Sequence, residues 1–163
     1  MGNQGVTELF FESAEPSFAE QSLAELFTRF PAGNYTFRGT AVDGQTLNAK
    51  APLKHNIPAG TDIVSPAPGA VLDTNGPILI DWEPVASPFP GTALAVNIVG
   101  YQVIVERVKP QPLRVFSINL PSTVTQVAVS PEFIQANAEY TFEVLAIEAS
   151  GNQTISEGAF KTQ

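Results

Sequence analysis

The most regular feature of the chain is an alternation of apolar and polar positions that runs from about residue 62 to the C-terminus. A two-residue period of this kind indicates a strand with one buried face. The strongest instance places four side chains on one face: Tyr140, Phe142, Val144 and Ala146. Similar runs, or short apolar runs bounded by turn residues, lie at 63–64, 78–83, 98–108, 113–120, 123–129 and 155–162. About seven short strands separated by turns predict a β-sandwich.

One segment near the N-terminus follows a helical period instead. Apolar side chains recur there at intervals of three and four residues, which places them on one side of a helix: Leu23, Leu26, Phe27 and Phe30. Ser17 and Glu20 fit a capping box, in which the two side chains bond free amides at the helix start. Pro31 ends the pattern. We therefore expect one helix over residues 18–30, preceded by a short strand over 6–12.

Residues 34–41 and 46–54 indicate a β-hairpin around Asp43 and Gly44, a pair of residues that favours tight turns. The register that keeps the apolar faces together needs a loop with a bulge at Gly44. That register pairs Phe37 with Ala51 and Tyr35 with Leu53. We expect the apolar side of the helix to cover the apolar face of this hairpin.

A proline- and glycine-rich stretch at residues 56–69 divides the chain. It predicts an N-terminal segment over 1–58, with strand, helix and hairpin, and a sandwich over 59–163. A two-stranded hairpin with one helix has little core of its own, and Pro-rich linkers are stiff. We therefore expect the N-terminal segment to pack on the sandwich.

Several segments within residues 62–162 share the spacing of one known type of domain. They are the turn from Pro66 to Gly69, Ile78-x-Ile80-x-Trp82-x-Pro84, Gly100-Tyr101-x-Val103-x-Val105, Tyr140-x-Phe142-x-Val144-x-Ala146-Ile147 with Gly151, and Phe160-x-Thr162. On these residues the region resembles a fibronectin type III domain, whereas residues 1–58 resemble no family that we can name. The resemblance implies a seven-stranded immunoglobulin-like β-sandwich. The whole chain is then mainly β, with a small α+β segment of one helix and a hairpin at its start.

The resemblance also carries expectations for particular regions. Tyr140 lies where the family has its tyrosine-corner residue, whose hydroxyl bonds an upstream backbone group. Residues 133–139 lack the Leu and Pro-Gly that usually precede this tyrosine, and the loop 85–97 is long and Pro-rich for the family. The family implies a non-catalytic module located outside the cytoplasm, in a secreted or a bacterial periplasmic protein.

The amino-acid composition argues against several kinds of partner and site. Sixteen acidic against eight basic residues give a formal charge of −8, which argues against a nucleic-acid partner. The chain has no Cys and one His, which excludes disulfides, thiolate metal sites, Cys catalysis and multi-His metal sites within it. No apolar run approaches the roughly 18 residues of a membrane span. Residues 1–9 carry no signal-peptide pattern, so we expect them to be a start placed before an internal or mature sequence.

Single polar residues offer little chemistry. His55 stands without a nucleophile elbow or a second His, so we expect a boundary side chain that bonds locally. Asp73 begins a segment that resembles a calcium loop but lacks the remaining ligand spacing, so a turn is expected. Asp81 and Glu83 flank Trp82 on the opposite side of their strand and are expected to face solvent. We therefore predict no catalytic, cofactor-binding or metal-binding residues.

Aromatic and apolar side chains are the remaining candidates for binding. Trp82 and Tyr101 would suit a sugar-stacking platform, but both fall on inward faces and are expected in the core. The loop 85–97 carries Phe89 between two prolines, followed by Leu94, which makes it a candidate contact loop. An equal alternative is that Phe89 lies under its own loop.

Two functions from different classes follow from these observations. The first is a non-catalytic module of a larger or exported protein, which binds a protein or glycan at the cell surface or envelope, or separates neighbouring domains. The alternative is a carbohydrate-binding accessory domain of a secreted hydrolase, which needs solvent-exposed aromatics. An enzyme that uses carboxylates alone is a third alternative.

Overall fold

The computed structural model describes residues 20–163. The expected strand at 6–12 and the Ser17 side of the expected capping box lie outside these residues. The chain divides into two compact units, with the boundary between Leu53 and Lys54, and each unit is described by itself. Within the described part of the chain, no helix has both the length and the hydrophobicity needed to cross a membrane.

The first unit contains the helix α1 (Leu23–Arg29), which begins later than the sequence pattern predicted. Its N-cap is Ser22, whose Oγ accepts the Glu25 N–H at 3.3 Å, while the Glu25 carboxylate accepts the Ser22 N–H at 2.9 Å. The pattern Ser-x-Ala-Glu occurs at both Ser17 and Ser22, and Glu20 lies in a turn. The predicted start at residue 18 is therefore wrong, because the capping box that directly precedes the apolar stripe begins the helix.

A β-hairpin follows, in which β1 (Gly33–Thr40) pairs antiparallel with β2 (Thr46–Leu53). The loop turns at Gly44, whose φ is +84°, and Ala41 N–H bonds Gln45 O at 2.8 Å across it. A three-residue loop with its last residue in the left-handed region is a common hairpin closure, and it fixes the register. The predicted register is wrong by two residues, since Phe37 pairs with Ala49 and Tyr35 with Ala51.

The hairpin face that α1 was expected to cover is open. Phe37 and Leu47 keep 42% and 57% of their surface exposed, so α1 does not bury these two side chains. The prediction that α1 covers this face is wrong, because the helix is much shorter than the hairpin. The seven residues of α1 span about 10 Å, whereas the eight-residue strands of the hairpin extend about 26 Å.

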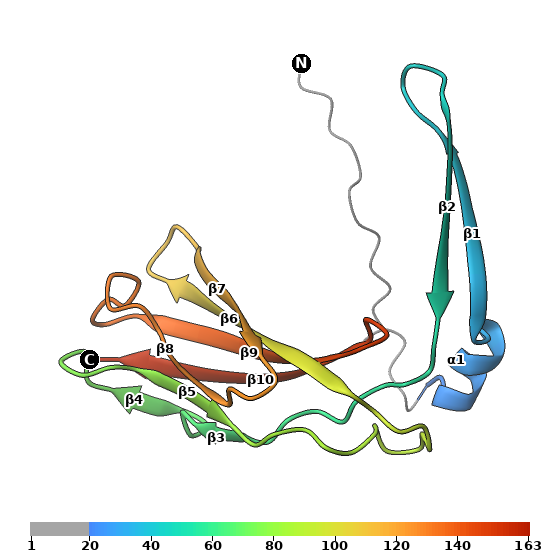
Figure 1. Cartoon of the computed structure of the whole chain (residues 1–163). Coiled ribbons are helices and arrows are strands. Elements are labelled where there is room, and N and C mark those ends of the chain that lie inside the picture. The colour runs from blue at the N-terminus through green and yellow to red at the C-terminus, as the bar shows by residue number, and fades with distance from the viewer. Residues whose placement is uncertain (1–19) are drawn as a thin grey trace. The chain divides into compact units, whose positions relative to one another are not determined.

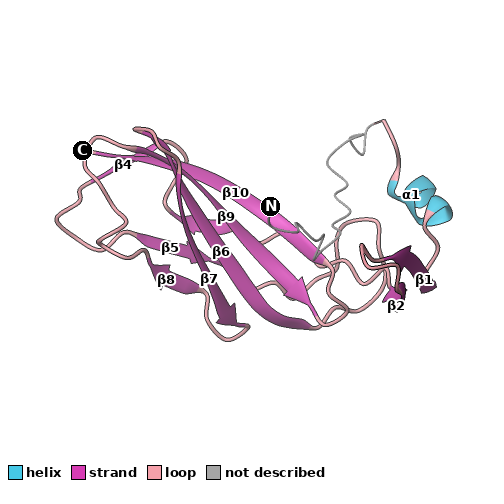
Figure 2. Cartoon of the chain, turned by 90° about the horizontal axis from the view of Figure 1, so that it is seen from above, coloured by secondary structure: helices cyan, strands magenta, loops and turns pink. Residues whose placement is uncertain are grey.

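The second unit, residues 54–163, is a β-sandwich of two sheets (Figure 1). The larger sheet has the strand order β4-β10-β9-β6-β7, and the smaller sheet has the order β3-β5-β8. Figure 2 shows β10, β9, β6 and β7 side by side in the larger sheet. The strands are β3 (Ile63–Ser65), β4 (Ala70–Leu72), β5 (Leu79–Trp82), β6 (Ile98–Lys109), β7 (Arg114–Pro121), β8 (Gln126–Ala128), β9 (Glu139–Glu148) and β10 (Gln153–Thr162).

The chain changes sheets between β3 and β4. β3 pairs antiparallel with β5 in the smaller sheet, whereas β4 pairs in parallel with β10 in the larger one. The turn from Pro66 to Gly69 lies between them, and Gly69 has a φ of +74°, a conformation that glycine adopts at low cost. The predicted turn is therefore confirmed, and it lets one stretch of chain form an edge of both sheets.

The core consists of the inward residues that the alternation predicted. Tyr101, Val103 and Val105 of β6 are at most 1% exposed, as are the four inward residues of β9 and, from the smaller sheet, Ile80 and Trp82. The rings of Trp82 and Tyr101 meet edge to face with centroids 5.4 Å apart, a favoured arrangement of aromatic pairs. The expectation that both rings lie in the core is confirmed.

Tyr140 forms the expected tyrosine corner. Its hydroxyl accepts the N–H of Gln135, five residues upstream, at 2.8 Å. Its ring stacks on Phe160 with centroids 4.8 Å apart and tilts against Phe133 at 5.9 Å. Phe133 belongs to the stretch that departs from the family pattern, and it supplies apolar cover there. The two sheets and this corner confirm the expected β-sandwich.

Candidate functional site

At one end of the sandwich, the long loop between β5 and β6 is tied to the segment that leads into β3. Two backbone hydrogen bonds of 2.9 Å join them, from Phe89 N–H to Ile57 O and from Ala59 N–H to Ser87 O. The Asn56 side chain adds a bond of 2.8 Å to a backbone oxygen of the same loop. The loop is therefore held along its length by its neighbour.

These bonds set the surroundings of the two candidate contact residues. Phe89 is half-buried and its N–H is engaged, and its carbonyl accepts the Thr92 hydroxyl at 2.8 Å. Leu94 is 48% exposed. Of the two, Leu94 offers the larger apolar surface to a partner.

A buried carboxylate organises the same end. Glu148, the last residue of β9, is 4% exposed. It accepts hydrogen bonds from Ser150 N–H at 2.6 Å, Ser150 Oγ at 2.5 Å and Asn97 N–H at 3.2 Å. Burial raises the pKa of Glu148, but these hydrogen bonds outweigh burial and hold the pKa below its usual value. The carboxylate is thus ionised near neutral pH and joins the β9–β10 turn to the start of β6.

The first residues of the unit are bound to the start of β10. Asn152 Nδ2 donates to Lys54 O at 2.8 Å and to Asn56 O at 3.1 Å. Thr154 Oγ1 donates to Pro58 O at 2.6 Å. We call this end of the sandwich, formed by residues 54–59, the β5–β6 loop and the β9–β10 turn, the entry end.

The other candidates from the sequence serve local structure. Asp73 accepts the Asn75 N–H at 2.8 Å, which closes the expected turn and lowers the pKa of Asp73. His55 is half-buried in the first residues of the unit. Asp81 is half-buried and Glu83 is exposed, in agreement with an outward position. Across the described ranges, no group of three His, Asp or Glu residues could hold a metal ion.

The most unusual polar side chain occupies an inward position that sequence reasoning missed. Arg107 follows Val105 in the inward row of β6 and is 6% exposed. Its Nη1 donates to Gln135 Oε1 at 2.5 Å and its Nη2 to Pro112 O at 3.2 Å, while its Nε has no partner. No carboxylate within residues 20–163 forms an ion pair with it. The sequence could have predicted this position, because Arg107 continues the inward alternation of Tyr101, Val103 and Val105.

Arg114 of β7 lies directly across from Arg107. Directly opposed residues of an antiparallel pair lie on the same face of the sheet, so the two guanidinium groups share one face. Arg114 is exposed and, like Arg107, has no ion pair among the described residues. Like charges in this arrangement repel each other, and a bound anion would relieve that repulsion.

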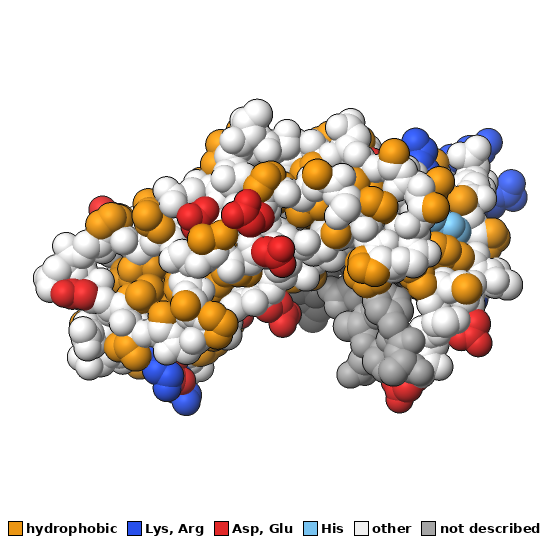
Figure 3. All heavy atoms as spheres, turned by 90° about the horizontal axis from the view of Figure 1, so that it is seen from below, with side chains coloured by type: hydrophobic (Ala, Val, Ile, Leu, Met, Phe, Trp, Pro, Cys, Tyr) orange, Lys and Arg blue, Asp and Glu red, His pale blue; other side chains and the backbone are white. Residues whose placement is uncertain are grey.

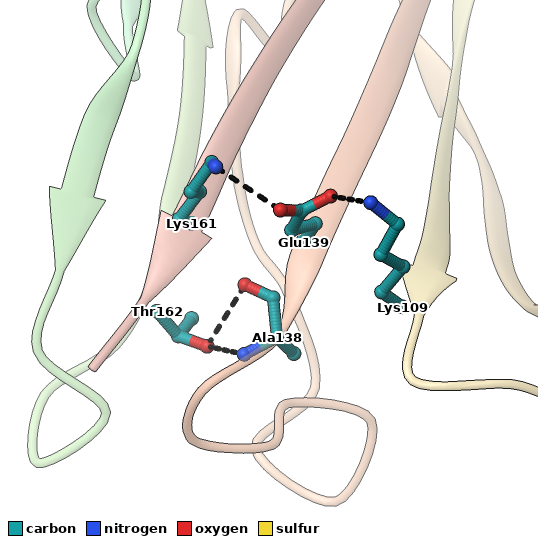
Figure 4. A network of polar contacts seen from close by, with 5 residues as sticks. All are labelled: Lys109, Ala138, Glu139, Lys161 and Thr162. Atoms are coloured by element: carbon teal, nitrogen blue, oxygen red, sulfur yellow. Dashed lines mark hydrogen bonds and ion pairs between the residues drawn. The ribbon is translucent and has the colours of Figure 1, made fainter.

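At the other end of β9 from Glu148, the carboxylate of Glu139 forms two ion pairs. Glu139 binds the Nζ atoms of Lys109 and Lys161, each at 3.0 Å (Figure 4). Hydrogen bonds from the two lysines hold the pKa of Glu139 below its usual value. Beside them, Thr162 Oγ1 accepts the Ala138 N–H at 3.0 Å. These contacts connect the ends of β6, β9 and β10.

The sandwich has few positively charged side chains, and most of them lie close together in the sequence. On the face drawn in Figure 3, acidic and hydrophobic side chains are interspersed, and Lys and Arg form small separate groups. Residues 61–163 carry ten acidic and four basic residues. Three of those four cations, Arg107, Lys109 and Arg114, belong to the β6–β7 hairpin.

No family model matches this sequence, and no curated protein matches it. Among solved structures, the chain is similar to the third fibronectin III domain of the human KIAA0343 protein, at 13% identity and a TM-score of 0.46, over 67% of this chain and 86% of that one. It is similar to the FN1–FN3 domains of chicken CNTN1, at 16% identity and a TM-score of 0.45. That match covers 79% of this chain and 43% of the CNTN1 chain. It is also similar to the fn3 domain of the human collagen alpha-1(XX) chain, at 18% identity and a TM-score of 0.38. That match covers 65% of this chain and 85% of the collagen domain. The fold assignment rests on the strand order and the tyrosine corner.

Proposed function

We propose that residues 54–163 form a non-catalytic interaction and spacer module of a larger or exported protein. The observation that carries this proposal is that the chain enters and leaves the sandwich at opposite ends. Lys54 and Pro58 are bound at the start of β10. The chain leaves at the other end of that strand, where the Gln163 N–H bonds Leu72 O at 3.1 Å.

The separation between entry and exit follows from the length of β10. Its ten residues at about 3.3 Å each span about 33 Å. A domain with its two chain ends this far apart separates whatever precedes it from whatever follows it. The hydrogen bonds of the entry end and the ion pairs of Glu139 keep both ends fixed to the sheet.

The carboxylates support a non-catalytic role. Glu148, Glu139 and Asp73 all have a pKa held below its usual value by hydrogen bonds to neighbouring groups. A general acid needs a carboxyl group whose pKa is raised towards the working pH. These three side chains instead accept hydrogen bonds from neighbouring groups as anions near neutral pH.

Location and partner are the finer parts of the proposal. We place the module outside the cytoplasm, in an extracellular or periplasmic protein, on the resemblance of its sequence pattern. We assign contact with a protein or glycan partner to the entry end, where Leu94 is 48% exposed on a loop that also carries Phe89.

The spacer role is tested by a distance measurement, for which the absence of Cys is convenient. In the full chain, Lys54→Cys and Gln163→Cys carry a pair of spin labels, and the matched control pair is Lys54→Cys with Gln153→Cys at the start of β10. The first pair is expected at about 30 Å, the length of β10, and the control pair far closer. A single short distance for both pairs would overturn the proposal.

The carbohydrate-binding alternative needs exposed rings. In residues 54–163 the rings of Trp82, Tyr101, Tyr140, Phe142 and Phe160 are buried, and those of Phe89, Phe116 and Phe133 are half-buried. A glycan array probed with the full chain tests this alternative. Specific glycan binding that is lost in Phe89→Ala, which removes the ring of the β5–β6 loop, would favour this alternative, and an array without hits would sink it.

A further inference from the structure

The long free edge of the larger sheet is the surface that a spacer role does not use. β7 is the last strand in the order of that sheet, so none of the described strands pairs with its outer side. The other edge strands of the sandwich, β3, β4 and β8, have three residues each, whereas β7 has eight. Short edge strands limit pairing with other chains, and β7 lacks this protection.

β7 also lacks the side chains that usually protect an edge. Arg114 begins it and Pro121 ends it, while residues 115–120 read Val-Phe-Ser-Ile-Asn-Leu, with no charge and no proline. Val115 is 54% exposed. Every second residue of such a strand directs its backbone N–H and C=O away from its only partner. The edge is therefore ready to receive a further strand.

The arginine pair gives this edge a preference for negative charge. In a strand added beside β7, one side chain would lie directly across from Arg114, on the face that Arg114 shares with Arg107. A carboxylate at that position would form an opposite-charge pair in place of the present repulsion. Arg107 lies one strand further in and is buried, so it adds positive charge to this face without bonding the added strand directly.

We propose that the β7 edge binds an extended, acidic segment of a partner protein as an added strand, with one carboxylate of that segment held by Arg114 and attracted by the nearby positive charge of Arg107. Backbone hydrogen bonds to β7 supply the affinity, and the arginine pair selects the side chain. A second copy of this chain is a poorer occupant, because each copy carries a formal charge of −8 and the copies repel each other. The proposal rests on the proposed function only in that both assign protein binding to the sandwich.

The test uses the isotope-labelled full chain and two synthetic peptides of about the length of β7. Both peptides alternate Thr and Val and differ only in a central Glu or Gln. Amide signals of residues 114–121 are expected to shift on titration. The Glu peptide is expected to bind about tenfold more tightly than the Gln peptide at low ionic strength, the effect of one charge-assisted contact. Added salt is expected to reduce this difference.

Two variants identify the charge responsible. Arg114→Gln is expected to fold, because Arg114 is exposed, and to remove the difference between the peptides. The control Lys54→Gln removes an exposed positive charge at the entry end and is expected to leave the difference unchanged.

Three results would overturn the proposal. They are equal affinities for the two peptides, shifts confined to residues outside β7, and protection of the β7 amides by self-association of the chain without peptide. None of them bears on the distance between Lys54 and Gln163, so the failure of this proposal and the failure of the spacer role are separate observations.

Discussion

At Gly158 of β10, a Cβ atom would stand 2.3 Å from Cζ of Phe142. The two residues are directly paired across β9 and β10, and Phe142 is 1% exposed. The ring therefore occupies the space that a side chain at position 158 would need. Alternation alone predicts an inward side chain here, because Phe160 of the same strand points into the core. A single close approach thus decides the residue type at this position.

Gly158→Ala is expected to lower the free energy of unfolding by about 2 kcal/mol, because the added methyl overpacks the core against a ring that has no room to move. Chemical denaturation measures the loss. The control Gly76→Ala places its methyl in open space and is expected to leave stability nearly unchanged. In the double variant Gly158→Ala with Phe142→Leu, part of the loss is expected to return. Equal stabilities of the two glycine variants would contradict the steric explanation.

Tyr140→Phe removes the hydroxyl that accepts the Gln135 N–H at 2.8 Å in a partly buried position. It is expected to cost about 1–2 kcal/mol, since the amide is left without its partner. Tyr35→Phe is the matched control, because the Tyr35 hydroxyl makes an exposed bond of 2.9 Å to Pro31 O, where water can replace it. Thermal unfolding followed by circular dichroism compares the two, and a larger effect of Tyr35→Phe would argue against the corner as a stabilising contact.

Among the elements, the β9–β10 hairpin runs between the two ends of the unit. Its turn is closed by Gly151, with a φ of +93°, and by the buried carboxylate of Glu148. Because Glu148 also bonds the Asn97 N–H, one side chain fixes the hairpin turn and the first residues of β6. β7, by contrast, pairs with β6 alone among the described strands, and its outer backbone groups are available to another chain.

Stability is expected to fall in acid through Glu148. Its pKa is lower in the folded chain than in the unfolded chain, where a glutamate titrates at about 4.3. Its contribution is therefore fully present above that pH and is lost as the pH falls through the lower, folded pKa. Glu148→Gln is expected to cost about 2 kcal/mol near pH 7, and to flatten the dependence of unfolding free energy on pH below about 5.

The control for this acid dependence is Glu157→Gln. Glu157 is exposed on β10 and no hydrogen bond or ion pair is seen for it in the described part of the chain. At pH 7 this variant is expected to lose less free energy of unfolding than Glu148→Gln, because it leaves the hydrogen bonds of Glu148 intact. Identical profiles for Glu148→Gln and the original chain would show that the buried carboxylate is not the group that titrates.

At the scale of the whole molecule, the two units differ in what holds them together. Residues 54–163 bury a continuous core that includes Trp82, Tyr101, Tyr140, Phe142 and Phe160. The described elements of the first unit bury no residue fully: α1 has none, and Tyr35 and Leu53 are only half-buried in the hairpin. The prediction that residues 1–58 pack on the sandwich stays a prediction.

A truncated chain of residues 54–163 is expected to fold on its own, because it contains the whole of the core and both sheets. Chemical denaturation of the truncated and full chains, each followed by Trp82 fluorescence, measures the difference. A full chain that is more stable by 1 kcal/mol or more, roughly the effect of burying a single apolar side chain, would support packing of the N-terminal segment. Equal stabilities would contradict that packing, and an unfolded truncated chain would contradict the independence of the sandwich.

The sequence by itself determined the sandwich, because strands with one buried face must repeat every two residues. The inward rows of β6 and β9 were predicted from this local period, and the turn at Pro66 to Gly69 and the tyrosine corner from the resemblance to a known family. The sequence pattern also predicted the helix and the hairpin, but it did not predict where the helix begins or the register of the hairpin. Two identical capping patterns and several loop closures compete there with nearly equal local energies.

Only the tertiary structure decided which polar residues matter. Glu148, Arg107 and Gly158 owe their roles to partners that are distant in the sequence, at Asn97, Gln135 and Phe142 respectively. The free edge of β7 is likewise a property of the strand order, since each strand carries the same backbone groups. Periodicity reports which side of a strand is buried, whereas the identity of the neighbour across that side is fixed only when the sheets assemble.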